Sequence, residues 1–443
     1  MSNSISKDFK FFSLLRFALP SMVMMVFMSL YTIVDGIFIS RLVGSKALSA
    51  TNIVFPVINI LIAVGIMLAS GGSAVIARKL GEKKGDEARR DFSMIALVSV
   101  IFGIVSLILG YAALTPLVKL LGSTPVIQEY CETYLSILLY FGPACMLQMF
   151  FQMFFVTAGK PHIGLTITIL GGITNSVFDY ILMGPFHMGI AGAAIATGLG
   201  QMIPAVIGVI YFCCVKNDLH FVKPSLDMQV LKESCLNGSS EMVTNLSNAI
   251  VTYLFNIIML DLMGEEGVAA ITIVLYGQFL FNALYMGFSM GVAPVFSFNY
   301  GRQNETLLKR IYKICVMFIV MSSVVITIMA LAGSEVIVSI FTPRNTETFA
   351  IAAGGFFLFS FNYLFAGMNI FASGIFTAFS DGKVSAIISF LRTFGLLIGC
   401  ILLLPRIIGE NGVWLSVPIA EALTVFVSIW FFVKKRKKYH YGE

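Results

Sequence analysis

Long apolar segments follow one another along this chain, and they limit its possible folds more than any other feature. Runs of about 20 or more mostly apolar residues recur from Phe11 to Val433, with short polar stretches between them. A run of that length matches a helix that crosses a hydrocarbon core about 30 Å thick. The chain is 58% hydrophobic and only 12% charged, whereas soluble domains contain about 25% charged residues. A membrane β-barrel would instead show alternating segments of about ten residues. The sequence therefore predicts an all-α membrane protein.

The apolar segments predict twelve transmembrane helices. Their expected ranges are 11–40, 51–79, 92–115, 127–157, 162–183, 190–215, 232–262, 268–300, 310–333, 346–379, 384–404 and 412–433. The first segment is too long for the apolar region of a cleavable signal peptide, so we interpret it as a membrane helix.

Basic residues are distributed unevenly between the two sets of predicted loops. One set, with both ends of the chain, carries 23 Lys and Arg, and the opposite set carries five. Cytoplasmic loops of membrane proteins carry an excess of Lys and Arg. We therefore expect both termini in the cytoplasm and an even number of spans. The net charge of +6 is explained by this bias, so we expect no nucleic-acid partner.

The chain contains a weak internal repeat at an offset of 220 residues. Without a gap, "ASGGSAVIARKLGEKKGDEARR" (69–90) aligns with "SMGVAPVFSFNYGRQNETLLKR" (289–310), so that Gly71 matches Gly291 and Gly81 matches Gly301. Six helices separate the copies, so both enter the membrane from the same side. This pattern predicts two six-helix lobes, 1–218 and 219–443, related by a parallel pseudo-two-fold axis.

Two aspartates interrupt the predicted helices at similar depth. Asp35 lies five residues before the outer end of the first helix, and Asp179 lies four before the outer end of the fifth. Asn175 precedes Asp179 by one helical turn and shares its face. Thr197 lies at comparable depth in the sixth helix. These oxygens suit a proton, Na⁺ or both, so we predict a cation-coupling site in the N-terminal lobe.

A simpler interpretation is that each aspartate is hydrated near a helix end. Two acids at matched depth favour the coupling site, because charged groups inside a membrane are costly. The two carboxylates would repel each other, so at least one is expected to hold a proton near neutral pH. At the repeat offset Asp35 matches Phe255. We therefore expect coupling in the first lobe alone.

Other polar and bend-forming positions allow two interpretations each. Pro20 either bends the first helix, by removing a backbone hydrogen bond, or lies harmlessly in its first turn. Arg392 is expected to extend toward the cytoplasm along its helix. Glu241 is equally well explained as a first-turn acid. For Glu421, the sequence leaves open whether the side chain faces a cleft between the lobes.

Two segments mix aromatic residues with Met, Gln and Asn, which suits a pliable cavity for bulky amphipathic cations. They are "YFGPACMLQMFFQMFF" (140–155) and "YGQFLFNALYMGFSMG" (276–291). Helix packing explains each of these residues equally well. With a tyrosine of the first helix, the predicted cavity residues are Tyr31, Gln152, Phe154, Tyr276, Gln278, Asn282 and Met286.

No cluster of metal ligands or catalytic groups stands out in the sequence. The seven cysteines include no CxxC pair, and the four histidines lie far apart. We therefore expect neither a metal, nor a cofactor, nor an enzyme. A coupling ion, H⁺ or Na⁺, would be the only bound ion.

Several motifs resemble those of the multidrug and toxic compound extrusion (MATE) family, and in particular its bacterial DinF/MepA-like branch. They are "VDGIFISRLVGSKALSA", "LGEKKGDEARR", "AGKP", "TNSVFDYILM" and "GIAGAAIAT". The resemblance covers the whole chain. It implies a monomeric transporter in the bacterial plasma membrane that exchanges organic cations for H⁺ or Na⁺. It also implies a cation site at Asp35, Asn175, Asp179 and Thr197, and a role in helix bending for Pro20. Another branch also uses acids in the second lobe, but Asn362 and Asn369 occupy the tenth helix here.

Two other functions compete with drug export. A flippase for lipid-linked oligosaccharide or peptidoglycan precursors would need a cationic cavity for the diphosphate, and Arg392 is the only basic residue well inside a predicted span. A membrane enzyme would need converging nucleophiles or acids, and the sequence indicates none.

Overall fold

A computed structural model describes residues 4–216 and 218–442, and these residues contain helices and no strand. The first half of the chain supplies a short 3₁₀ turn, eight α-helices and a π-helical turn. They are η1 (Ser4–Ser6), α1 (Phe11–Phe38), η2 (Ile39–Val43), α2 (Ser45–Gly81), α3 (Gly85–Ala112), α4 (Leu114–Leu120), α5 (Gln128–Tyr140), α6 (Gly142–Thr157), α7 (Pro161–Met183) and α8 (Gly189–Cys214).

The second half supplies eight more α-helices and two short turns. They are α9 (Met228–Gly301), α10 (Glu305–Ala332), α11 (Ser334–Phe341), α12 (Glu347–Phe359), η3 (Ser360–Asn362), α13 (Tyr363–Ala378), α14 (Gly382–Phe390), η4 (Leu391–Gly395), α15 (Leu396–Ile408) and α16 (Glu410–Lys435). The turn η4 is π-helical and joins α14 to α15 within one span.

These helices make twelve membrane crossings, as the sequence predicts. Ten helical segments are long and apolar enough to cross, and α5 with α6 forms one more span, bent by 56°. The 74-residue α9 contains two crossings, because its backbone turns at Gly264, where φ is 66° and ψ is −155°. Only glycine adopts such a conformation readily. The protein is therefore a multi-pass membrane protein.

Helix ends are fixed by residues that satisfy free backbone groups. Asp227 accepts hydrogen bonds from the amides of Gln229 and Val230, and Asn304 accepts one from Leu307. Such caps typically contribute about 1 kcal/mol each. The structure also differs from the sequence expectations at two sets of elements. The helices α2 and α3 extend several residues beyond the predicted apolar segments, and short helices α4 and α11 fill outer loops.

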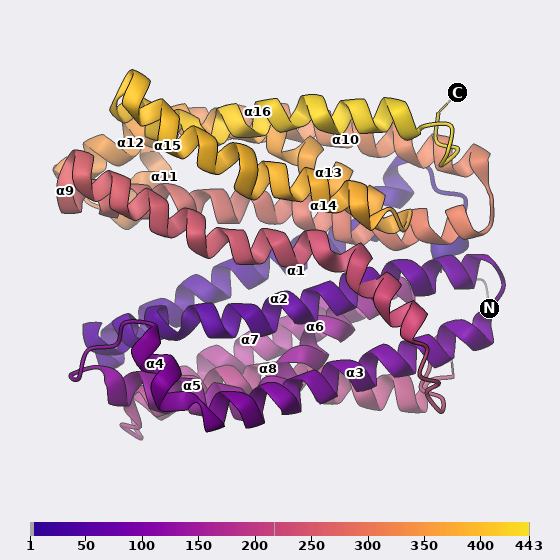
Figure 1. Ribbon diagram of the computed structural model, residues 1–443, viewed down its shortest axis with the longest axis horizontal. Coiled ribbons are helices and arrows are strands. Elements are labelled where there is room, and N and C mark those ends of the chain that lie inside the picture. Colours follow the sequence, from indigo (N-terminus) through magenta and orange to yellow (C-terminus); the bar gives the residue numbers. More distant parts are fainter. Residues whose placement is uncertain (1–3, 217, 443) are drawn as a thin grey trace.

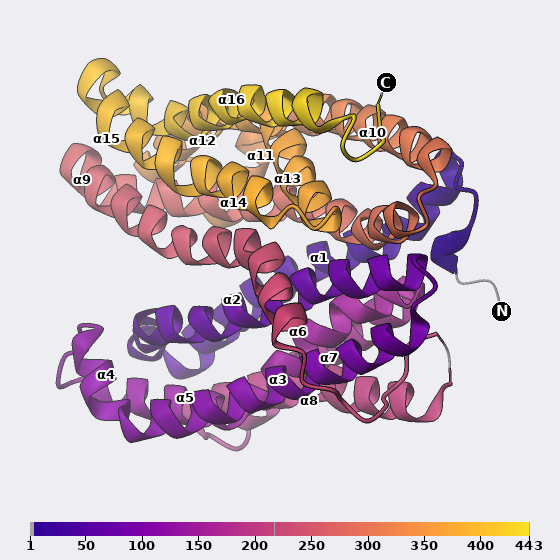
Figure 2. The same cartoon turned by 45° about the vertical axis from the view of Figure 1, so that its right-hand side comes forward.

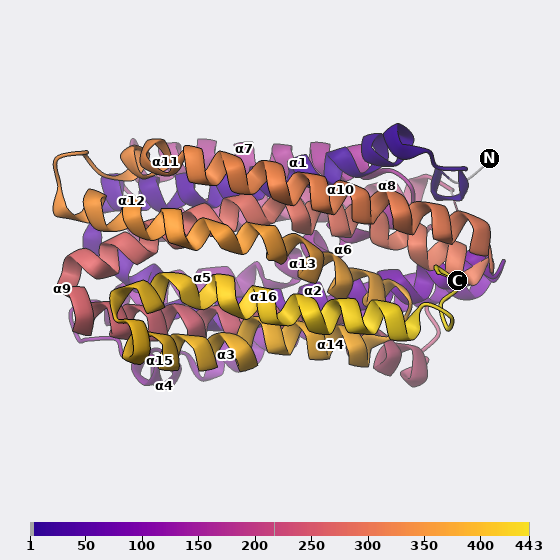
Figure 3. The ribbon, with the colours of Figure 1, turned by 90° about the horizontal axis from the view of Figure 1, so that it is seen from above.

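The helices form two lobes, with α2–α8 gathered in one and α10–α16 in the other, and the two termini lie at one end (Figures 1 and 3). The apolar core of the second half is one cluster that extends to Ile5 and Ala18 of the N-terminal stretch. The core of the first half falls into two clusters. Along α7, Asn175 and Asp179 lie between Ile167 of one cluster and Met183 of the other.

Close contacts between α2 and α9 obey the repeat found in the sequence. A Cβ added to Gly81 would lie 2.0 Å from the carbonyl oxygen of Phe298, and one added to Gly301 would lie 2.1 Å from that of Arg78. At the 220-residue offset these two contacts are equivalent. The glycines therefore lie beside the pseudo-two-fold axis, where only residues without a side chain allow the backbones to meet.

The lobes are joined at the end that carries the basic loops. Here Arg78 of α2 forms an ion pair with Glu233 of α9 at 2.8 Å, and Gly71 approaches Ser234 and Gly238 closely. Midway, the Asn59 side-chain amide donates to the Asn245 carbonyl at 2.8 Å. Toward the other end the ribbons of the two lobes diverge (Figure 2). The conformation is thus closed at the basic end.

Candidate functional site

The four residues predicted for cation coupling come from three helices of the first lobe. Asp35 lies on α1, Asn175 and Asp179 on α7, and Thr197 on α8. Asp35 is within interaction range of both Asp179 and Asn175. Asp179 is completely buried and Asn175 is 3% exposed, while Asp35 and Thr197 are half-buried. The structure therefore gathers the four residues in one place.

Polar atoms of this group lack partners within the chain. Both carboxylate oxygens of Asp179, both side-chain amide atoms of Asn175, one oxygen of Asp35 and the Thr197 hydroxyl are buried without a hydrogen bond to any described residue. An unsatisfied buried polar group typically costs about 1–3 kcal/mol, and more when it is charged. The donor set of carboxylate, amide and hydroxyl oxygens fits a proton or a hard cation such as Na⁺.

Tyrosines surround the carboxylates and were only partly foreseen from the sequence. Tyr31 of α1 interacts with Asp35 and lies beside Gln148 of α6. Tyr134 of α5 contacts Thr197 and lies within electrostatic range of both aspartates, and it is only 6% exposed. In the sequence Tyr134 is one aromatic residue in an apolar helix. No spacing signal distinguishes it from a packing residue, so sequence reasoning missed it.

The second lobe has its own polar cluster, and it corrects the expectation for Arg392. That side chain does not extend toward the cytoplasm. Its Nε donates to Glu421 Oε1 at 2.6 Å, and the two side chains are 13% and 4% exposed. Asn369 donates to the other Glu421 oxygen at 2.7 Å, and Ser428 donates to Asn369 Oδ1 at 2.7 Å. Glu421 is therefore a satisfied, ion-paired core residue.

Two further expectations are corrected by where the helices begin. The helix α9 starts at Met228, so Glu241 lies well inside it and is not a first-turn acid. Glu241 lies within electrostatic range of Arg392. The helix α1 starts at Phe11, which places Pro20 in its interior. The first-turn interpretation of Pro20 is therefore wrong.

The residues predicted for a substrate cavity are scattered rather than gathered. Phe154 is fully buried and stacks on Phe150 at 4.2 Å, so it belongs to the core of the first lobe and does not face a cavity. Gln152 bonds to Thr168 inside the same lobe. Tyr276 is 45% exposed and stacks on Phe341 toward the outer end of the second lobe.

Three predicted cavity residues lie together on α9. Gln278, Asn282 and Met286 are half-buried and spaced one helical turn apart. Asn282 Oδ1 is buried without a hydrogen-bond partner among the described residues. Met286 packs against the core of the second lobe. This segment stays a candidate for substrate contact.

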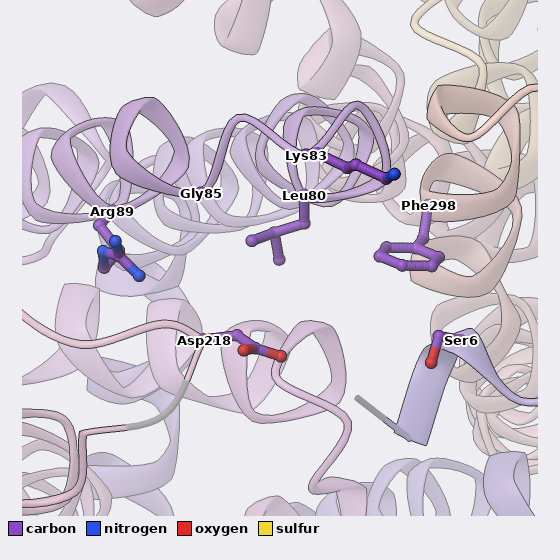
Figure 4. A pocket seen from close by; sticks show the side chains of 7 residues that line it. All are labelled: Ser6, Leu80, Lys83, Gly85, Arg89, Asp218 and Phe298. Carbon is purple, nitrogen blue, oxygen red and sulfur yellow. The ribbon is translucent and has the colours of Figure 1, made fainter. Parts of the chain in front are cut away.

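Two surface hollows, of about 300 and 360 Å³, lie at the basic end and away from the carboxylate group. Figure 4 shows the first, bounded by Leu80 and Lys83 on one side, by Asp218 on the other, and by Ser6 and Phe298. Its walls thus come from both halves of the chain. Neither hollow contains a residue predicted for the substrate cavity.

Comparison with known proteins identifies the family. The MatE family model matches residues 20–181 and 242–401 of this chain, which is well over half of its length. The chain belongs to the MatE family. The resemblance seen in the motifs is thereby confirmed, and members of this family are transport proteins rather than enzymes.

Relatives and solved structures match this MatE chain nearly end to end. A "Multidrug export protein MepA" from Staphylococcus saprophyticus is 21% identical over 427 residues, covering 96% of this chain and 93% of that protein. Its namesake from Staphylococcus haemolyticus is 24% identical over 432 residues, covering 97% and 94%. A crystal structure of "MATE in the straight conformation" matches with a TM-score of 0.91 at 21% identity, covering 96% of each chain. At that identity the structural match establishes the two-lobe, twelve-helix fold.

Proposed function

We propose that this protein exports amphipathic organic cations and related drugs across a bacterial plasma membrane by exchange with H⁺ or Na⁺. The observation that carries the proposal is the group of Asp35, Asn175 and Asp179. It combines two acids and an amide whose buried atoms have no partner within the described chain. The names of the staphylococcal relatives, multidrug export proteins, support the class of substrate.

The coupling step needs a site that is occupied by a cation in one conformation and emptied in the other. With both aspartates ionised, repulsion between them favours uptake of a proton or of Na⁺. With the cation bound, that repulsion is relieved and α1 is free to change its packing on α7. Alternating access then follows if the lobes open at one end while they close at the other. Under this proposal both termini face the cytoplasm.

Between H⁺ and Na⁺ as the coupling ion, we favour the proton because of the ligands. Two neighbouring carboxylates share a proton readily, whereas a dedicated Na⁺ site would gather more oxygens around the ion. Substrate binding to the purified protein, measured between pH 5 and 8 with and without Na⁺, tests the choice. Binding that is insensitive to pH but strongly shifted by Na⁺ would overturn the proton assignment.

A flippase for diphosphate-linked lipids fits the structure less well. It would need a free cation in the membrane interior to meet the diphosphate. Arg392 is the basic residue that lies well inside a span, and Glu421 neutralises it at 2.6 Å. The arrangement in the second lobe therefore favours the export of cations over the flipping of anionic lipids.

Efflux from proteoliposomes tests the proposed function directly. Ethidium and norfloxacin efflux is expected to follow an imposed proton gradient and to stop in Asp35→Asn and Asp179→Asn. Exchange of one monovalent cation for one proton moves no net charge, so the pH difference sets the substrate gradient, about ten-fold for each pH unit. Asp261→Asn, an exposed aspartate outside the site, is the matched control. Full efflux by both site variants would refute the role of the pair.

A further inference from the structure

The last helix continues into a basic tail that folds back onto the second lobe. The helix α16 ends at Lys435, inside the sequence "KKRKK" (434–438). Beyond it the Tyr439 ring stacks on Phe379 at 4.8 Å with an interplanar angle of 6°. The Tyr441 hydroxyl donates to the Phe432 carbonyl at 2.7 Å. Both tyrosines are buried. The tail is therefore anchored to the lobe and has a defined orientation.

The five basic residues of the tail form two groups, according to whether they pair with Asp381. The Asp381 carboxylate, between α13 and α14, accepts a hydrogen bond from the Tyr439 hydroxyl at 2.5 Å. It also pairs with Lys435 at 3.4 Å and Lys438 at 3.8 Å. Burial alone would raise the pKa of Asp381, but the tyrosine and the two lysines outweigh it and lower that pKa. The anchor is fully formed above the ordinary aspartate pKa of about 4, and it weakens only as pH falls through the lowered value.

The other three basic residues have no acidic partner among the described residues. Lys434, Arg436 and Lys437 are exposed and form no ion pair with any described residue. Lys434 Nζ instead lies 4.2 Å from the centre of the Trp430 ring. Lys435 and Lys438 are thus held toward Asp381, whereas the other three basic side chains are open to solvent or lipid.

The surface next to these cations is apolar and exposed, as expected of a surface that contacts lipid. Trp430 is 52% exposed, and Phe426 and Val433 are 71% and 57% exposed. Successive members of this set are four and three residues apart along α16, so they form one apolar stripe on that helix. Tryptophan is enriched at the boundary between the hydrocarbon core and the headgroups. The stripe therefore ends at headgroup level, beside these three exposed cations.

We propose that Lys434, Arg436 and Lys437, with Trp430, form a binding site for the headgroup of an anionic phospholipid. The phosphate would meet the guanidinium of Arg436 and the two ammonium groups, while the acyl chains lie along the apolar stripe of α16. Clusters of basic residues beside a membrane helix attract anionic lipids by about 1 kcal/mol per residue near the surface. The site is independent of the proposed transport function, because it needs neither a coupling ion nor a drug.

The position of the tryptophans makes the site directly measurable. The chain contains two tryptophans. Trp414 is 3% exposed, whereas Trp430 is at the proposed site. In full-length protein reconstituted in bilayers, brominated lipids quench the fluorescence of tryptophans that they contact. We expect brominated phosphatidylglycerol to associate at Trp430 at least about five-fold more strongly than brominated phosphatidylcholine, the factor that corresponds to about 1 kcal/mol, and 0.5 M NaCl to reduce this preference by screening.

Two double variants test whether the preference for phosphatidylglycerol arises at the proposed site. In Arg436→Gln/Lys437→Gln, which leaves Lys434 over Trp430, the five-fold preference is expected to fall close to one. In the matched control Lys313→Gln/Lys383→Gln, two exposed cations are removed from other elements at the same end of the lobe, and the preference is expected to persist.

Three outcomes would overturn the proposal. They are equal quenching of the wild type by both lipids, an equal loss of preference in the control variant, and retention of the preference in Arg436→Gln/Lys437→Gln. A fourth concerns the source of the phosphate group. If inorganic phosphate abolishes the preference at matched ionic strength, the site takes a soluble anion and not a lipid.

Discussion

At the scale of single residues, the buried acids of the two lobes differ in whether they have partners. In the first lobe, Asp35 and Asp179 lie side by side with buried oxygens that lack partners. In the second, Glu421 is held by Arg392 and Asn369. An ion-paired acid stays ionised, whereas two neighbouring acids without partners are stabilised when they bind a cation. This contrast supports coupling through the first lobe alone.

Tyr134 gives a residue-scale prediction that the sequence did not suggest. Its side chain lies against Thr197 and near both aspartates. Because the hydroxyl lies within electrostatic range of both carboxylates, Tyr134→Phe should shift the pH at which substrate binding changes, by about one unit. Tyr140→Phe, on the same helix but 60% exposed, is the control. Equal pH profiles for wild type and Tyr134→Phe would exclude a role for the hydroxyl.

The pair of Arg392 and Glu421 gives a stability prediction. Removal of one partner of a buried ion pair typically costs about 3–5 kcal/mol, because it leaves a charge without compensation. Arg392→Met should therefore lower the thermal unfolding midpoint clearly, while Arg392→Met/Glu421→Gln should recover most of the loss. Thermal unfolding of the purified protein in detergent measures both. A double variant as unstable as the single one would mean that the cost comes from packing and not from charge.

At the scale of elements, α1 is shared between the lobes. Its first half packs in the core of the second lobe through Leu14 and Ala18, and Ser21 and Met22 contact Gly287 of α9. Its outer half carries Asp35 beside α7 of the first lobe. Pro20 lies within the first half, directly before Ser21 and Met22, and removes the backbone hydrogen bond there. A bend at Pro20 would thus move the outer half, with Ser21 and Met22, while Leu14 and Ala18 keep their packing in the second lobe.

Replacement of Pro20 tests this role of α1. Pro20→Ala restores the hydrogen bond and stiffens the helix, so it should lower the transport rate more than the substrate affinity. Efflux rate and binding are measured on the same purified variant. Because the first-turn interpretation no longer applies, a wild-type turnover rate would show that α1 does not bend during transport.

The sequence predicts the elements of this fold better than it predicts their side-chain contacts. The twelve spans follow from the length of apolar runs, which the bilayer fixes, and a short turn at Gly264 joins two of them. The acids Asp35 and Asp179 stand out because such residues are rare inside a membrane. Partners such as Tyr134, or the pairing of Arg392 with Glu421, depend on which faces of distant helices meet. A single sequence does not encode that in any local pattern.

At the scale of the whole molecule, the pseudo-two-fold repeat defines where the lobes meet. Gly81 contacts Phe298 and Gly301 contacts Arg78, and a second equivalent pair joins Gly71 to Gly238 and Gly291 to Ala18. Each contact brings backbone against backbone or a small side chain. The basic end therefore closes by close packing about the axis, and the ion pair between Arg78 and Glu233 reinforces it.

A methyl group at Gly81 should force this end open. The Cβ of Gly81→Ala would lie 2.0 Å from the Phe298 carbonyl oxygen, a backbone atom that cannot turn away, so the lobes must separate there. We expect the distance between spin labels at Lys83 and Gln303, which are equivalent in the repeat, to increase by several ångströms.

The labels are placed in a background where Ser replaces the exposed Cys213 and Cys214. Gly354→Ala, whose added Cβ meets nothing within 4 Å, is the control and should leave the distance unchanged. Because exchange requires the basic end to close in one half of the cycle, Gly81→Ala should also slow efflux more than it weakens substrate binding. An unchanged label distance together with wild-type efflux would mean that the close contact at Gly81 is not what seals the basic end.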